Sequence, residues 1–196
     1  MYSNVERIVT VIAIVLLAGC AGKDFVRPDS TSLKNGQTTY SQIVQQFGKP
    51  YAEGSVLKNE KFVKTVSYAY ASVGGKSHRG GTAARAMGFY FVDDTLVGYE
   101  FISSFAEDNT DFDEMKINQI TEGKTTLHEV IQLLGKPSGY YIYPMIESES
   151  GEAATYAYSE AKGSAFNMKM FRKMLVITYD RGRVVTKVEY TSFGSN

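Results

Sequence analysis

One segment of the chain occurs twice, and this internal repeat most constrains the fold. Residues 38–50 read TTYSQIVQQFGKP and residues 125–137 read TTLHEVIQLLGKP, an offset of 87 positions with six of thirteen residues identical. Further matches follow at an offset of 88, where Tyr-Ala-Tyr occurs at 68–70 and again at 156–158. Recurrence at a fixed offset indicates a supersecondary unit that is repeated in tandem.

Each copy begins with a helix signal. Thr39 and Thr126 are each followed three residues later by Gln or Glu, which is the spacing of a capping box. Apolar residues then recur at i, i+3, i+4 and i+7, as on one face of a short amphipathic helix. Gly48 and Gly135 follow, and we expect both in the left-handed conformation that ends a helix. Residues 30–35 and 113–121 are expected to form further short helices.

After the helices the hydrophobic period changes to two, which indicates strands. The expected strands are residues 65–72, 87–92 and 96–103 in the first copy and 154–159, 174–180 and 183–191 in the second. The predicted fold class is therefore α+β, with two tandem α-α-β-β-β units, antiparallel sheets and helices packed on one face. The repeats are assigned to residues 30–108 and 109–196.

The N-terminus is typical of an export signal. Residues 8–18 form an apolar run of 11 residues, whereas a membrane-spanning helix needs about 20. The run ends in Leu17-Ala18-Gly19-Cys20, which resembles the lipobox of bacterial lipoproteins. This resemblance implies that residues 1–19 are a signal peptide cleaved between Gly19 and Cys20, that Cys20 carries lipid, and that residues 20–29 are a tether. Ala21 after the cysteine implies the periplasmic face of the outer membrane. The alternative is a buried N-terminal helix with a free cysteine.

The repeated motif itself resembles a known family. Gly-x-Thr-Thr before the helix and Gly-Lys-Pro after it, behind a lipobox, are similar to the SmpA/OmlA (BamE-like) lipoproteins. That resemblance implies a part in outer-membrane protein assembly or envelope integrity. Two such units in tandem also resemble the β-lactamase inhibitor proteins, whose joined sheets form a concave binding surface.

Composition argues against several classes of function. Lys plus Arg and Asp plus Glu are both 21, so bulk positive charge for nucleic acid is absent. One Cys and two His supply little for a metal centre. Gly75-Lys76-Ser77 lacks the upstream glycine of a phosphate loop, and no motif joins a nucleophile to a base. We therefore expect no catalytic residues, no cofactor, no metal and no small-molecule substrate.

We expect a non-catalytic scaffolding lipoprotein, held to the membrane by Cys20, that binds one or more envelope proteins. The alternative is an inhibitor or sequestering protein that covers an enzyme with its concave sheet; a periplasmic hydrolase using His78 or His128 is a third class.

The helix-free face, with Tyr90 on it and aromatic loops at its rim, is the expected contact surface. The candidate contact residues are Tyr90, Tyr140, Tyr141 and Tyr143 as aromatic anchors, and Lys76, Arg79 and Arg172 as basic ones. Otherwise the aromatic segment is a strand or a cover for the helices, and the basic residues lie in solvated loops.

Overall fold

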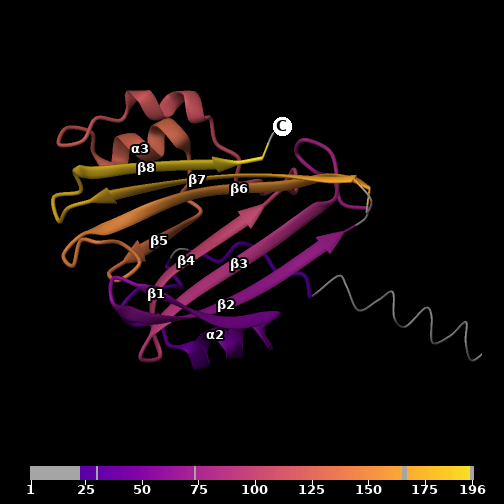
Figure 1. Ribbon diagram of the computed structural model, residues 1–196, viewed down its shortest axis with the longest axis horizontal. Helices are drawn as coiled ribbons and strands as arrows, with labels where there is room; N and C mark the ends of the chain where they lie inside the picture. The colour runs from indigo at the N-terminus through magenta and orange to yellow at the C-terminus, as the bar shows by residue number, and fades with distance from the viewer. Residues whose placement is uncertain (1–22, 30, 73, 165–166, 195–196) are drawn as a thin grey trace, which may run out of the picture.

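The computed structural model describes residues 23–29, 31–72, 74–164 and 167–194, and its main feature is one antiparallel sheet. Eight strands pair in chain order, so that each strand lies beside the strands that precede and follow it (Figure 1). The strands are β1 (Ala52–Lys58), β2 (Lys61–Ser72), β3 (Ala83–Val92), β4 (Thr95–Ser103), β5 (Gly139–Ile142), β6 (Glu152–Ser164), β7 (Asn167–Tyr179) and β8 (Val185–Phe193).

Two short helices lie where the repeat predicts them, α2 (Tyr40–Phe47) and α3 (Leu127–Leu134). Both begin with the predicted capping box, in which the threonine hydroxyl accepts from the third helical N–H and the third side chain accepts from the cap N–H. Gly48 has φ 82° and Gly135 has φ 84°, so both glycines adopt the predicted positive φ. Helical structure is otherwise confined, in the described residues, to the 3₁₀ segment η2 (Glu114–Gln119).

The predicted fold class is nevertheless wrong. The protein is predominantly β, with one continuous eight-stranded sheet and few helical residues, instead of two tandem α-α-β-β-β units. A helix was expected over residues 30–35, but the described residues 31–35 contain no helix, and the 3₁₀ segment η2 replaces the helix expected over residues 113–121. The sequence gives no prediction of β1, and β5 lies in the aromatic segment for which a strand was the alternative to a binding loop.

The two unexpected strands have different physical causes. Every residue of β1 is exposed, so this strand shows no hydrophobic alternation. Its hairpin with β2 depends instead on Asn59 and Glu60, whose φ values of 44° and 64° match the turn that suits the twist of paired strands. Three residues of β5 pair with β4 on one side and all four pair with β6 on the other, which joins the two copies into one sheet.

One face of the sheet carries both helices. A register row runs across the sheet on this face and consists of Val66, Phe89, Tyr99, Tyr140, Ala154, Ile177 and Val188. The first copy packs Ile43 of α2 on this row, and the second packs Val130 of α3 on it. Phe89 and Ile177 are fully buried beneath the helices.

The segment expected to be a tether packs against the body of the protein. Phe25 makes edge-to-face contacts with Phe47 of α2 and Phe101 of β4, with ring centroids 6.4 Å apart in both pairs. Arg27 donates to the carbonyl oxygens of Lys136 and Pro137, beyond the end of α3. Burial lowers the pKa of Arg27. Residues 23–29 therefore belong to the helical face.

Candidate binding face of the sheet

The face opposite the helices is concave. Arg172 on β7 points its Nη2 atom to within 3.4 Å of Oε1 of Glu100 on β4, although β5 and β6 separate these strands in the sheet. Side chains that far apart in a flat sheet do not meet, because neighbouring strands are about 4.8 Å apart. The sheet therefore curls, with the helices outside and this face inside.

A polar cluster lies on the floor of the concave face. Glu100 is buried between Gly88 and Gly139 on the neighbouring strands. It accepts hydrogen bonds from the hydroxyls of Tyr90, at 3.2 Å, and Tyr141, at 2.9 Å. Burial is the main cause that raises the pKa of both tyrosines, and the nearby Glu100 charge raises it further. The phenols therefore stay neutral and act as hydrogen-bond donors.

A loop covers one end of this face. Asn59, in the β1–β2 turn, donates from Nδ2 to the carbonyl oxygens of Pro144 and Ile146, both at 3.0 Å. The Tyr143 hydroxyl donates to the carbonyl of Asn59 at 3.1 Å. The β5–β6 loop is thereby fixed to a hairpin more than 80 residues earlier in the chain.

The other end of the concave face remains an open groove of about 490 Å³. Five alanines contribute to its floor, supplied by β2 and β3 on one side and by β6 on the other. The alanines are Ala69, Ala71, Ala84, Ala86 and Ala161. Met170, 57% exposed, and Tyr51, 77% exposed, stand at the rim with Lys162. The small alanine side chains on adjacent strands leave room for the groove. In the sequence, the groove is indicated by alanine at every second position, at 69 and 71 and at 84 and 86.

The predicted aromatic anchors are distributed over both faces. Tyr90 and Tyr141 lie on the concave face, 5.5 Å apart between ring centroids, and Tyr141 is only 4% exposed. Tyr140 lies on the helical face and contacts Tyr99. Tyr143 is partly buried and contacts Asn59 as described above. The four residues therefore do not form one exposed aromatic patch.

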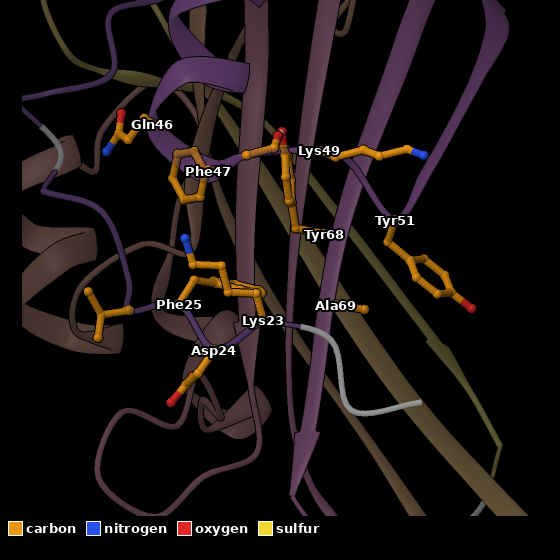
Figure 2. A pocket seen from close by; sticks show the side chains of 11 residues that line it. Lys23, Asp24, Phe25, Gln46, Phe47, Lys49, Tyr51, Tyr68 and Ala69 are labelled. Atoms are coloured by element: carbon orange, nitrogen blue, oxygen red, sulfur yellow. The ribbon is translucent and has the colours of Figure 1, made fainter. Parts of the chain in front are cut away.

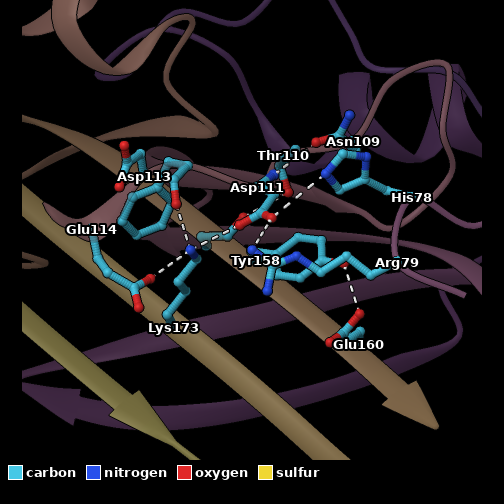
Figure 3. Close-up of polar contacts among 12 residues, drawn as sticks. His78, Arg79, Asn109, Thr110, Asp111, Asp113, Glu114, Tyr158, Glu160 and Lys173 are labelled. Atoms are coloured by element: carbon cyan, nitrogen blue, oxygen red, sulfur yellow. Dashed lines mark hydrogen bonds and ion pairs between the residues drawn. The ribbon is translucent and has the colours of Figure 1, made fainter. Parts of the chain in front are cut away.

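The basic candidates are also separated. Lys76 is exposed in the β2–β3 loop, and Arg172 is half-exposed beside Glu100 on the concave face. Arg79 instead makes an internal contact, with Nη2 2.6 Å from Oδ2 of Asp111 and its guanidinium 5.7 Å above the Tyr158 ring (Figure 3).

The Arg79 contact belongs to a larger ionic network. Asp111 also approaches Nζ of Lys173 at 2.8 Å, and Glu114 approaches the same ammonium at 2.7 Å. Lys173 is only 1% exposed, so these two carboxylates offset the cost of burying its charge. Figure 3 shows the network joining the β2–β3 loop, the segment that links the two copies, and β7. These ion pairs hold the three segments together, so we assign the network a structural role.

A second hollow, of about 680 Å³, lies on the outer side where the docked N-terminal segment meets α2 (Figure 2). Phe25, Phe47 and Tyr68 form its apolar wall, and Lys23, Lys49 and Tyr51 stand around it. Tyr51 and Ala69 line both this hollow and the groove on the concave face. The two depressions therefore adjoin at the edge of β2 beyond the start of β1.

Several predictions concern residues that the structure does not describe. Gly19 and Cys20 precede residue 23, so lipidation and cleavage remain predictions. Among the described residues, no group of three or more His, Cys, Asp or Glu side chains is arranged to hold a metal ion. No helix in the described ranges combines the length and apolar character needed to cross a membrane.

Comparisons with known proteins give a limited result. No protein-family model matches the chain, and no curated protein matches its sequence. Among solved structures, the chain is similar to a Streptococcus mutans crystal structure described as a "putative beta-lactamase inhibitor protein". The two share 13% identity and a TM-score of 0.41, over 92% of this chain and 96% of the other.

Proposed function

We propose that the protein is a non-catalytic lipoprotein of the periplasmic side of the outer membrane that binds another envelope protein through its concave face. The observation that carries this proposal is the alanine-floored groove on the helix-free side of the sheet. A stable protein interface needs a well-packed apolar centre with polar groups around it, and the groove supplies both.

The rim indicates what kind of segment would enter. Lys162 at the rim is positively charged and about half exposed, and Met170 offers a flexible apolar contact. Arg172 lies outside the lining but pairs across the sheet with Ser159, which lines it, and is also about half exposed. A protruding loop with an apolar side chain beside an acidic one fits this combination. In an SmpA/OmlA-like role the loop would belong to a component of outer-membrane assembly. In an inhibitor role it would belong to a soluble enzyme.

The groove can be tested by filling it. Ala86 is exposed and lines the groove, so Ala86→Leu should block entry of a partner side chain and weaken binding at least tenfold, equivalent to about 1.4 kcal/mol. Ala52→Leu is the matched control, because Ala52 is also an exposed strand alanine but lies on β1, outside the groove lining. Binding partners are captured by crosslinking the full chain in the envelope and identifying the products.

The identity of the crosslinked protein separates the two roles. Barrel-assembly components support a scaffold, and a single soluble enzyme supports an inhibitor. Equal crosslinking of wild type and the folded Ala86→Leu variant would contradict the assignment of the binding face. Turnover of a substrate by the purified protein would contradict the non-catalytic role.

A further inference from the structure

The docked segment leaves very little chain between Cys20 and the folded body. Asp24 Oδ1 lies 2.8 Å from Nη1 of Arg85, whose side chain is 6% exposed and is also held by Glu107 and Asp108. Phe25 and Arg27 add the aromatic and carbonyl contacts described above. The body therefore begins at Asp24, four residues after Cys20.

This spacing sets a limit on distance from the membrane. Four residues span at most about 14 Å even when fully extended. The headgroup layer of a bilayer is itself roughly 5–8 Å thick. A lipid on Cys20, which is part of the proposed function, would thus hold Asp24 close to the headgroups.

The surface beside Asp24 has the side chains suited to that position. Val26 is 73% exposed and Tyr51 is 77% exposed, and Lys23 and Lys49 are exposed beside them. Figure 2 shows Lys49 and Tyr51 pointing outward from the wall of the outer hollow. Tyrosine favours the membrane interface, and lysine can place its stem among apolar groups while its ammonium stays in water.

We infer that this surface, formed by Lys23, Val26, Lys49 and Tyr51, faces the phospholipid leaflet, with Tyr51 in the headgroup layer. Because Tyr51 also lines the groove, the groove then opens beside the membrane. A partner segment that enters it must come from the membrane-proximal part of the partner. This inference depends on the proposed lipid anchor but assigns an orientation that the anchor alone does not.

The absence of tryptophan from the sequence makes the test direct. Tyr51→Trp introduces a single fluorophore at the proposed membrane surface. Phe62→Trp is the matched control, because Phe62 is 78% exposed but lies seven residues from Ala69 along β2, roughly 23 Å away. Each protein, purified from membranes, is reconstituted in phosphatidylcholine vesicles that contain a minor fraction of phosphatidylcholine with a nitroxide on its headgroup.

We expect the Tyr51→Trp protein to lose most of its emission and the Phe62→Trp protein to lose little. Inserting about twenty Gly and Ser residues after Lys23, which span roughly 25 Å on average, should restore the emission of the first protein. Equal quenching of both proteins, with mass spectrometry showing lipid on Cys20, would overturn the orientation and leave the anchor intact. An unlipidated Cys20 would overturn the anchor and the orientation together.

Discussion

The guanidinium of Arg172 on β7 lies 3.4 Å from the carboxylate of Glu100 on β4, across the concave face of the sheet. The two partners differ in burial, because the Arg172 side chain is 51% exposed and that of Glu100 only 8%. Glu100 also accepts from Tyr90 and Tyr141, whereas Arg172 stands at the water boundary. The carboxylate is therefore the structural member of the pair, and the arginine is available to a partner.

This asymmetry predicts unequal effects of substitution. Glu100→Ala leaves two tyrosine hydroxyls without their acceptor and should reduce the free energy of unfolding by roughly 1–3 kcal/mol. Arg172→Ala should reduce it by less than about 1 kcal/mol, as for other solvent-screened ion pairs. Urea unfolding of both variants checks the order, and a larger loss for Arg172→Ala would contradict it.

The junction between β4 and β5 should not tolerate a side chain at position 139. A Cβ on Gly139 would fall onto the carbonyl oxygen of Tyr99, which belongs to the neighbouring strand. Gly139→Ala should therefore force the strands apart and cost roughly 1–3 kcal/mol. Gly74→Ala is the control, because nothing lies within 4 Å of its added Cβ. Thermal unfolding of the two variants provides the comparison, and similar melting temperatures would refute the expected clash.

Each helix depends on its first turn. Thr126 of α3 accepts from the Glu129 N–H, and the Glu129 side chain accepts from the Thr126 N–H. Thr126→Ala removes the capping side chain and should cost about 1 kcal/mol. Thr126→Ser, which keeps the hydroxyl, should restore most of that loss. Denaturant midpoints measured on both variants decide the point, and equal midpoints would show that the cap contributes nothing.

Buried tyrosines predict a loss of stability in alkali. Burial raises the pKa of Tyr68 to about 12 and that of Tyr99 to about 12, from an ordinary value near 10. Above pH 10 the unfolded chain loses phenol protons that the folded protein retains, so the free energy of unfolding falls as pH rises from about 10 to about 12. Urea midpoints measured over this range should decrease.

The Tyr68→Phe variant isolates one part of this effect. It removes the hydroxyl that donates to the Gly48 carbonyl at 2.8 Å, so stability at neutral pH should fall by about 1 kcal/mol. Because phenylalanine does not titrate, the decrease between pH 10 and 12 should become shallower than in wild type. An unchanged slope would show that Tyr68 does not contribute to it.

The sequence predicts the local structure of this protein better than its architecture. Capping residues and terminal glycines determine where α2 and α3 begin and end, and these short-range signals are unambiguous. The β1 strand has no such signal, because an exposed edge strand needs no apolar alternation. The union of the two copies depends on β5, four residues long, whose pairing with β4 and β6 is a tertiary event.

In the candidate site, the sequence predicts which face of the sheet a residue lies on but not which residues it contacts. Tyr90 was placed correctly on the helix-free face, because strand alternation assigns sides to β3. The partners of Tyr90 and Arg172 could not be predicted, because both meet Glu100 only after the sheet curls. Arg79 is a charged residue in a loop, which favours a prediction of surface exposure. Its pairing with Asp111 depends on how a loop from one copy crosses to the other.

The strictly sequential order of the strands has a consequence for how the chain reaches this structure. Seven neighbouring pairs join consecutive strands, and in the described part of the chain the longest connection runs from Ser103 to Gly139. Sheets built from consecutive hairpins have low contact order and form faster than sheets that pair distant segments. Because the proposed function includes export N-terminus first, we expect β1 to β4 to pair before the second copy has crossed the membrane. In that case the later strands can add in chain order to the free edge of β4.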